Sequence, residues 1–488
     1  MRSRLTTVML PGLLLLAGII PPAAARTSAT SDAIPCPAGA VSANVECIAT
    51  ISDLRGAIAV NFIGDTMFVS RQIGLSAYDI SDPSTPELLG VLPMYLWENE
   101  DMDVDPVRKR VFLSRDPRGF TTSATSGATF PYGAVHIIDA SNPHALVQVG
   151  FFLVPAGHTS TCINSCDFLW TGGPYANAQT QPGYTGRPIY ATDVRDPANP
   201  VACPQPIDLG RDDGVTNYAH DVQVDADGIA WVSGDGGVRG YWTTGTHRNP
   251  LTGEMATATG CSPIPYGGGG TPYAGEGASG GTYSKFMHNA WRNPSANIPD
   301  EDDPETPEDE TLGHVLYGTE ENITSNCAQS GRFATYDLRG SYEGEGWRST
   351  PTAKFRMRVL DTWTPQGAEG STGCASAHYM ADRGDGVLAY AFYGQGTRFL
   401  DVSNPKDITQ IGYYRPNGAS TWAPYWHNGE VYIADNSRGV DIIRFTGEAG
   451  DPASSAPLIP ASQVAQPFEM SKTFAYLCPV AAEGLRIG

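Results

Sequence analysis

Positive charges are few in this sequence. Lys and Arg number 31 against 52 Asp and Glu, which gives a net charge of −21 over 488 residues. Because an acidic surface repels phosphate backbones, we do not expect nucleic acid as a partner. Amphipathic helical periodicity is also missing after the N-terminal leader, whereas Gly (55), Pro (38) and aromatic residues (10%) are abundant. This composition indicates an all-β protein of many short strands and turns.

Long apolar runs are equally scarce. The single one, residues 8–20, follows Arg2 and Arg4 and precedes small residues at 23–25. These parts predict a signal peptide over residues 1–25. The run is too short to span a bilayer comfortably, and no second run follows it. We therefore expect a secreted, extracellular protein without a membrane span.

CxxC pairs of cysteines and the sequence motifs of common catalytic sites are missing as well. The nine cysteines contain no CxxC pair, which argues against a zinc ribbon, and their scatter fits an oxidising compartment. Cys162 and Cys166 are close enough for a local disulfide, while the other pairings stay open. No GxSxG elbow, Walker loop or Rossmann fingerprint occurs, so nucleophilic, phosphate-loop and dinucleotide chemistry have little support.

What the chain does contain is a repeat, which is clearest in residues 218–234 (YAHDVQVDADGIAWVSG). Apolar and polar residues alternate from Val222 to Asp225, Asp227-Gly228 predicts a hairpin turn, and an apolar second strand follows. The third strand of a unit ends in a turn closed by Asp-Pro or Asn-Pro, as in AYDISDP (77–83), HIIDASNP (136–143), ATDVRDP (191–197) and FLDVSNP (399–405). Pro cannot donate to the ladder, and the preceding Asp or Asn can cap its own turn.

The repeat predicts a seven-bladed β-propeller over residues 44–447. Seven units start near Gly56, Asn99, Gly157, Tyr218, Phe286, Ala377 and Ser420. The last unit has three strands, so we expect residues 44–51 to complete it as a fourth strand and close the ring, which removes open sheet edges. Residues 26–43 form an N-terminal segment, and residues 448–488 a tail that packs outside the ring or is partly disordered.

Two insertions depart from the repeat. Residues 260–285 are Gly-rich, and we interpret them as a loop between the fourth and fifth units. Residues 299–310 (PDEDDPETPEDE) form an acidic run, which we expect to be a solvated loop. A weak calcium site is the alternative for this run, although the ligand spacing and Gly of an EF-hand loop are missing.

With the D-[IV]-S-[DN]-P turns and their flanking strands, the chain resembles the LVIVD-repeat proteins, which are bacterial, secreted or surface-located β-propellers. The resemblance covers most of residues 45–446. It implies the propeller architecture and an extracellular location, and it says little about activity. The long insertions and the histidines depart from a plain repeat.

Four histidines occupy one equivalent position, the start of the first strand in the third to sixth units. They are His158, His220, His288 and His378. The first strands of a propeller line its central channel and begin at the same face, so we expect these imidazoles to form a ring at the channel mouth. Clustered neutral imidazoles are ligands for Fe, Cu, Zn, Mn or Ni. The alternative is that they only line the channel and were inherited by duplication.

Carboxylates stand at similar positions. Glu100, Asp101 and Asp103 begin the second unit, and one of them could be a fifth ligand or could orient an imidazole. Glu320 and Glu321, placed on the second strand of the fifth unit, are further candidates. A seven-bladed ring with four channel histidines is similar in layout to the iron-dependent carotenoid oxygenases, although the blade sequences are not recognisably shared.

Two functions remain open. The first is a secreted metal-dependent enzyme acting on an extracellular small molecule or polymer, with Fe or Cu favoured for oxidative cleavage and Mn or Zn for lyase or hydrolytic chemistry. Its candidate catalytic residues are Tyr218, Tyr379, Asp101 and Glu320, and its aromatic pocket would use Trp97, Trp291 and Trp422. The second is a non-catalytic binding propeller without metal, which presents its loop face to a protein or other partner.

Overall fold

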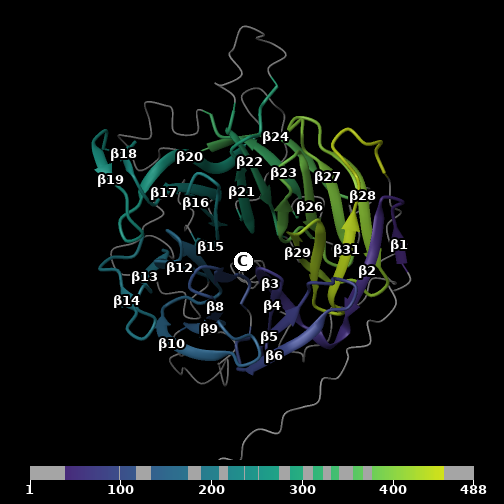
Figure 1. The fold of residues 1–488 in the computed structure, drawn as a ribbon. Coiled ribbons are helices and arrows are strands. Elements are labelled where there is room, and N and C mark those ends of the chain that lie inside the picture. The colour runs from purple at the N-terminus through teal and green to yellow at the C-terminus, as the bar shows by residue number, and fades with distance from the viewer. Residues whose placement is uncertain are drawn as a thin grey trace, which may run out of the picture. The chain divides into compact units, whose positions relative to one another are not determined.

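Seven blades of β-strands surround a central axis in the computed structural model (Figure 1). The residues that the structure describes are 39–97, 99–116, 133–173, 188–207, 218–235, 237–250, 252–273, 286–299, 312–321, 331–339, 356–365 and 376–454. Within these ranges there is no α-helix, and the only helical turn is the 3-10 turn η1 (Ser52–Leu54). The predicted all-β, seven-bladed propeller is therefore confirmed.

Blades 1 to 3 are four-stranded antiparallel sheets in sequence order. Blade 1 contains β3 (Ala57–Ile63), β4 (Thr66–Arg71), β5 (Gly74–Asp79) and β6 (Glu87–Pro93). Blade 2 contains β7 (Met102–Asp105), β8 (Arg110–Arg115), β9 (Gly133–Asp139) and β10 (Val147–Val154). Blade 3 contains β11 (Thr159–Ile163), β12 (Phe168–Gly172), β13 (Tyr190–Asp193) and β14 (Val201–Ala202).

Blades 4 and 5 are joined into one eight-stranded sheet. Blade 4 contains β15 (Tyr218–Val224), β16 (Ile229–Asp235), β17 (Gly237–Trp242) and β20 (Ile264–Tyr273). Blade 5 contains β21 (Asn289–Asn293), β22 (Val315–Thr319), β23 (Phe333–Asp337) and β24 (Arg356–Trp363). The outer strands β20 and β24 pair in parallel, and a separate hairpin of β18 (Thr246–Arg248) and β19 (Met255–Thr257) projects from blade 4.

Blades 6 and 7 take strands from both ends of the chain. Blade 6 contains β25 (Met380–Asp382), β26 (Val387–Ala391), β27 (Thr397–Asp401) and β28 (Thr409–Pro416), extended by β1 (Gly39–Val41). Blade 7 contains β29 (Thr421–His427), β30 (Glu430–Asp435) and β31 (Gly439–Phe445), completed by β2 (Val45–Ile51). The pairing of Val45 with Phe445 and of Ile51 with Val440 is the predicted closure by an N-terminal strand.

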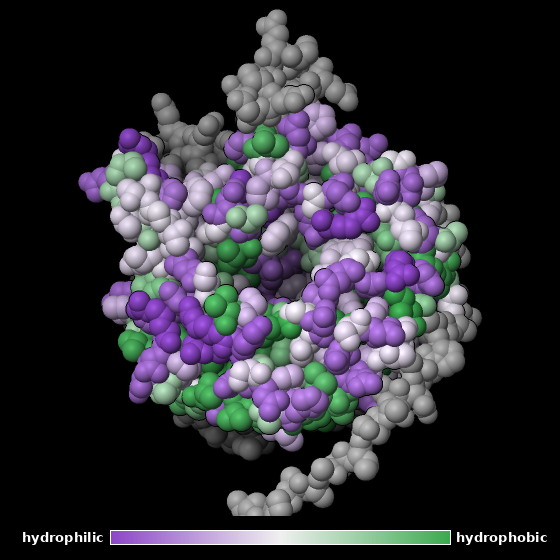
Figure 2. Space-filling view, in the orientation of Figure 1, coloured by the Kyte–Doolittle hydropathy of each residue, from purple (hydrophilic) through white to green (hydrophobic). Residues whose placement is uncertain are grey.

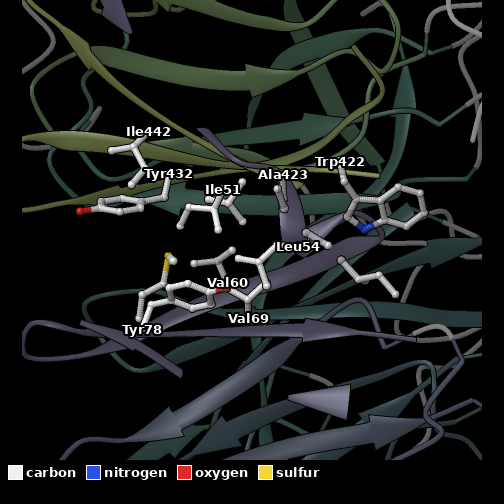
Figure 3. Close-up of a cluster of buried hydrophobic side chains, with 14 of the residues drawn as sticks. Ile51, Leu54, Val60, Val69, Tyr78, Trp422, Ala423, Tyr432 and Ile442 are labelled. Carbon is white, nitrogen blue, oxygen red and sulfur yellow. The ribbon is translucent and has the colours of Figure 1, made fainter. Parts of the chain in front are cut away.

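The hydrophobic core is divided among the spaces between blades. Each pair of neighbouring blades encloses one cluster of buried apolar side chains, and seven such clusters occur in the described residues. In the cluster between blades 7 and 1, Ile51 of the closing strand packs with Val60 and Tyr78 of blade 1 and with Ile442 of blade 7 (Figure 3). Ring closure and apolar burial therefore reinforce each other.

The turns that end the third strands use the caps that the repeat predicted. Asp79 accepts the backbone N–H of Ser81 through Oδ1, and Asp82 accepts that of Ser84. The same pairs recur at Asp139 and Asn142 in blade 2, and at Asp401 and Asn404 in blade 6. These carboxylates and amides satisfy backbone donors of the turns, which is a structural role.

The Gly-rich insertion is not wholly a loop, and this part of the interpretation was wrong. Residues 264–273 form β20, the outer strand of blade 4. Gly269 has φ +110°, and a Cβ there would overlap the carbonyl oxygen of Val238. Glycine therefore permits close pairing with β17 in a strand whose composition suggests a loop. The leader, the acidic run after residue 299 and most of the tail lie outside the described residues.

Two disulfides are present in the described residues. Cys162 and Cys166 form the local disulfide that their spacing suggested. Cys203 and Cys261 form a second disulfide that ties the end of blade 3 to the insertion of blade 4. This second pairing could not be read from the sequence.

Candidate metal centre

The first strands of the seven blades are neighbours around the axis. Each blade places one residue at an equivalent position at or just before its first strand, and these are Ile58, Glu100, His158, His220, His288, His378 and Trp422. Five adjacent blades thus supply one carboxylate and four imidazoles, while blades 7 and 1 supply apolar side chains. The predicted convergence of the four histidines is present, and of the three acidic candidates in blade 2 it is Glu100 that joins them.

The carboxylate of Glu100 lies among the four imidazoles. Its Oε2 is 3.1 Å from Nε2 of His158, 3.5 Å from Nε2 of His220 and 3.2 Å from Nε2 of His288. Its Oε1 is 3.6 Å from Nε2 of His378. All five side chains are fully buried. The histidines therefore do not stand at an open channel mouth, as we expected, but inside the molecule.

Backbone geometry directs one of these imidazoles. The pairing of β15 with β16 shifts between Ala219 and Asp221, so His220 is the extra residue of a β-bulge. A bulge re-aims the side chain at which it occurs. The alternation of side chains predicted for this strand is therefore interrupted at His220. As a result, the imidazole faces the axis instead of a neighbouring blade.

Hydrogen bonds at Nδ1 set the tautomers of three imidazoles. Nδ1 of His158 lies 3.0 Å from Oδ2 of Asp116. Nδ1 of His220 lies 3.1 Å from the carbonyl oxygen of His288, and Nδ1 of His378 lies 2.8 Å from that of Trp422. Because each partner is an acceptor, Nδ1 carries the proton, and in the neutral imidazole Nε2 presents a lone pair to the centre.

The imidazoles of His158 and His220 repel each other unless a positive charge lies between them. Nε2 of His158 and Nε2 of His220 are 3.1 Å apart, and both atoms carry lone pairs in the tautomers just described. The Glu100 carboxylate adds a negative charge beside them. Only a cation or additional protons can make these contacts attractive.

Electrostatics in the centre follow from burial and mutual contact. Burial alone would raise the pKa of Glu100, but His158, His288 and His220 outweigh it and hold this pKa well below its usual range. Burial, with the neighbouring His288, lowers the pKa of His220 strongly and that of His378 as well. Imidazoles with lowered pKa values stay neutral and keep their ligand lone pairs.

Two sets of side chains in the centre have the spacing of metal ligands. In each set the donor atoms lie within 4.8 Å of one another, and the sets are Glu100, His220 and His288 on one side and His288, Glu321 and His378 on the other. Ligand atoms about 2.0–2.2 Å from one transition-metal ion are separated by roughly 3.4 Å in a tetrahedral site. The contacts of Glu100 with its nearest imidazoles match that spacing.

A cavity of about 500 Å³ adjoins the centre and runs along the first strands. Its lining includes Glu100, which is thus shared between the cavity and the imidazole cluster. Polar side chains and aromatic rings make up most of the remaining lining, among them Asp101, Asp103, Asp382, Asn61, Gln223, Asn289, Trp291, Tyr379, Tyr425 and Trp426. Figure 2 shows one face of the ring, which is hollowed at its centre and hydrophilic in the depth of the hollow.

The four catalytic candidates have different surroundings. Tyr379 and Asp101 line the cavity, where the Tyr379 hydroxyl donates to Oδ1 of Asp221 at 3.2 Å. Glu320 instead holds Arg332 through both carboxylate oxygens and does not line the cavity. Tyr218 is the first residue of β15, and its side chain lies outside the described part of the structure.

The three tryptophans expected in an aromatic pocket also separate. Trp291 lines the cavity. Trp422 is fully buried with its ring centroid 4.0 Å from that of His378, so it supports an imidazole from behind. Trp97 is buried and does not line the cavity. The aromatic walls that sequence reasoning missed, Tyr425 and Trp426, belong to the first strand of blade 7.

Two acidic residues around the centre were also missed. Asp116 follows the second strand of blade 2 and holds His158, and Asp221 follows His220 and accepts from Asn289 at 2.7 Å. The sequence did contain a signal for Asp116. It directly follows the second strand of its blade, as Glu320 and Glu321 do in blade 5, and those two residues were already candidates. Only the packing of blade 2 against blade 3 shows that its carboxylate reaches the imidazole.

No helix long and apolar enough to cross a bilayer occurs in the ranges that the structure describes. No family model matches the chain, and no curated protein matches it. Among solved structures, the chain is similar to the β-propeller domain of Cps50 (Swd1) from Myceliophteria thermophila, with 9% identity, a TM-score of 0.48 and coverage of 82% of this chain and 100% of that chain. It is also similar to the periplasmic gluconolactonase PpgL of Pseudomonas aeruginosa, with 13% identity, a TM-score of 0.49 and coverage of 84% and 96%. We draw nothing about activity from these likenesses.

Proposed function

We propose that the chain is a secreted, metal-dependent enzyme whose ion is held by His158, His220, His288, His378 and Glu100. The observation that carries this proposal is the convergence of Nε2 lone pairs and a carboxylate in a fully buried space, with Nδ1 of His158 and His220 already committed to acceptors. A metal ion removes the repulsion and satisfies all of these atoms at once.

Protonation is the competing explanation, because one imidazolium beside Glu100 would also be attractive. Burial opposes it, since the charged form of an imidazole is disfavoured away from water and the pKa of both His220 and His378 is lowered. The pKa of His288 is raised instead: burial lowers it, but Glu100 overcomes that effect. One proton on His288 leaves the 3.1 Å contact between His158 and His220 unexplained.

The donor set favours iron or copper. Imidazole nitrogen with a single carboxylate and no thiolate suits Fe, Cu, Mn and Zn, and the first two also support redox chemistry. A redox-active ion with an open coordination position supplies dioxygen activation, which is the chemistry we propose. Manganese or zinc would instead fit lyase or hydrolytic chemistry.

The cavity supports a small substrate over a polymer. Its volume of about 500 Å³ lies within the range of small-molecule pockets, roughly 300–1,000 Å³. Its lining carries Glu100, Asp101, Asp103 and Asp382 and, among the described residues, no Lys or Arg. Such a lining repels anions, which argues against a lyase that acts on acidic polysaccharides and favours oxidation of a small neutral or cationic molecule.

Tyr379 and Asp101 are our candidates for proton transfer to a substrate in the cavity. The Tyr379 hydroxyl is fixed by Asp221, while Oδ2 of Asp101 accepts from the Thr161 hydroxyl at 2.6 Å. Both side chains adjoin Glu100 along the same cavity. Glu320 has no comparable access, because its carboxylate holds Arg332.

Export and family belong to the same proposal. The leader pattern of residues 1–25 and the two disulfides, which form in oxidising compartments, support secretion. The capped Asp-Pro and Asn-Pro turns support an LVIVD-type repeat protein of bacterial origin.

Metal analysis of the purified protein tests the proposal. We expect stoichiometric iron or copper in the wild-type protein, and loss of it when His220 and His288 are both changed to Ala. The matched control changes His144, which contacts the carbonyl oxygen of Leu89, and His427, which stacks on Phe62. Neither residue is among the side chains of the centre, so this variant should retain the metal. A wild-type protein that binds none of Fe, Cu, Mn and Zn would leave the non-catalytic binding propeller as the remaining function.

A further inference from the structure

We propose that this centre holds two metal ions bridged by the Glu100 carboxylate, with the second ion between His378 and Glu321. The inference rests on the proposed function, because it adds an ion to the same centre. It goes further in assigning Glu321 as a ligand and Glu100 as a bridge.

The starting observation is a group of buried polar atoms that have no hydrogen-bond partner. They are Glu100 Oε1 and Oε2, His288 Nδ1 and Nε2, His378 Nε2 and Glu321 Oε2. Unpaired buried polar atoms are rare in native proteins, and a cluster of them in one place indicates a missing ligand. All four residues are members of the two sets that have metal-ligand spacing.

The two oxygens of Glu100 divide the imidazoles between them. Oε2 faces Nε2 of His158, His220 and His288, at 3.1, 3.5 and 3.2 Å. Oε1 faces Nε2 of His378, at 3.6 Å. A carboxylate whose oxygens face different donor groups can bridge two ions, as carboxylates do in two-metal sites. The first position therefore has three imidazoles and one oxygen.

Glu321 supplies what the second position needs. Its carboxylate, only 3% exposed, lies within 4.8 Å of the donor atoms of His288 and His378. Oε1 is held by the Tyr393 hydroxyl at 2.5 Å, so the carboxylate is fixed in orientation while Oε2 has no partner. The second position would combine His378 Nε2 and Glu321 Oε2 with Glu100 Oε1, which lies 3.6 Å from that Nε2. His288 is the third member of the set that has ligand spacing around this position.

Charge balance points the same way. Glu100 and Glu321 are both buried in the centre. No ion pair between these carboxylates and a Lys or Arg occurs in the described ranges, whereas the adjacent Glu320 has Arg332. Buried carboxylates need a counter-charge. One divalent ion at the first position leaves Glu321 unpaired, and a second ion does not.

The test is the number of ions bound per chain in the full-length mature protein. The protein is loaded with Mn(II), separated from free metal and measured by inductively coupled plasma mass spectrometry. We expect two ions per chain in the wild type and one in Glu321→Gln. Glu320→Gln is the matched control and should keep two, because its side chain already pairs with Arg332 and Gln retains an acceptor.

A second readout does not depend on any variant folding. Two manganese ions that share a carboxylate are magnetically coupled, so the wild-type electron paramagnetic resonance spectrum should show coupling in place of the six lines of an isolated ion. One ion per chain in the wild type, or an isolated-ion spectrum, overturns the two-ion inference and leaves the proposed function intact. No bound manganese would also overturn the two-ion inference, whereas the proposed function would fall only if Fe, Cu and Zn failed to bind as well.

Discussion

At the scale of single residues, the chemistry of the centre is decided by what lies behind each imidazole. A histidine becomes a ligand when its other ring nitrogen is held by an acceptor, because this fixes both the tautomer and the ring orientation. Backbone carbonyls do this for His220 and His378, and a carboxylate does it for His158. Asp116, the partner of His158, therefore offers the most direct test of whether the contacts at Nδ1 support metal binding.

We expect Asp116→Ala to weaken metal binding about 10- to 100-fold, the usual effect of removing such a carboxylate partner. Asp116→Asn keeps an acceptor for Nδ1 of His158 and should lose less. Competition with a chelator of known affinity measures the change. Asp385→Asn, at an exposed side chain that pairs with Arg383, is the control and should bind metal as the wild type does. Equal affinity in Asp116→Ala and the wild type would show that this contact does not support the ligand.

At the scale of elements, strands depart from a regular ladder where function or close packing requires it. The bulge in β15 turns His220 toward the axis, and glycine in β20 lets blade 4 pair closely along its outer edge. Both departures would lower the stability of an isolated strand. Blade packing on either side supports them, because the side chains around them are buried.

Gly269→Ala should destabilise the protein by roughly 2–4 kcal/mol, because it combines an unfavourable φ with overlap against Val238. Gly253 is the matched control, since it also has positive φ (+76°) but has nothing within 4 Å of an added Cβ. We expect Gly253→Ala to cost about 1 kcal/mol or less. Thermal or denaturant unfolding of the two variants compares them directly, and equal losses would contradict the role given to close pairing.

The turn after β30 predicts a pH dependence of stability. Burial, together with Asp441, raises the pKa of Asp435 to about 7. A carboxyl whose folded pKa is raised binds its proton more tightly in the folded state, so its contribution is present at low pH and is lost as pH rises through about 7. The unfolding free energy should fall with a slope of at most about 1.4 kcal/mol per pH unit between about pH 4 and pH 7, and the slope should disappear above pH 7.

Asp435→Asn removes the titration of this side chain. Comparison of the variant with the wild type therefore separates the pH dependence due to Asp435 from that due to all other titratable groups. The variant should be less stable than the wild type at pH 5, because Asp435 accepts the backbone N–H groups of Ser420, Ser437 and Arg438 and the amide of Asn has only one acceptor oxygen. This difference should shrink as the pH rises, because only the wild type loses stability when Asp435 ionises. Its stability should also change less between pH 5 and 8 than that of the wild type. Parallel curves for the two proteins would mean that Asp435 is ionised throughout.

At the scale of the whole molecule, stability depends on closing the ring. Strand β2 supplies the outer strand of blade 7, and its Ala49 and Ile51 belong to the cluster between blades 7 and 1. Without it, β31 becomes an open edge and that cluster loses one wall. Open edges pair with other chains.

Removal of residues 1–51 should therefore give a protein that aggregates or unfolds at a markedly lower temperature than the wild type. A chain that begins at residue 43 loses the same leader and β1 but keeps β2 (Val45–Ile51), and it should stay monomeric with nearly the wild-type melting temperature. Size-exclusion chromatography and thermal unfolding distinguish the two. A monomeric, equally stable 52–488 chain would mean that closure by β2 contributes little.

The architecture could be predicted because it depends on local patterns that repeat. Alternating strands, Asp-Gly hairpins and Asp-Pro stops act within a few residues, and the three-stranded last unit required a partner strand from elsewhere. Among the strands that escaped prediction, β20 is so rich in Gly and Pro that its composition favours a loop. Its pairing with β17 depends on how closely two backbones approach, which composition does not encode.

Local patterns were enough to predict the ring and the convergence of the four histidines, because equivalent positions in repeated units fall on one circle. Tertiary structure alone decided the rest. Glu100 and not Asp101 reaches the imidazoles, Asp116 holds His158 from the neighbouring blade, and Glu320 is taken by Arg332 while Glu321 remains beside His378. These distinctions depend on side-chain direction across blade boundaries, between residues far apart in sequence. Local patterns carry no information about such contacts.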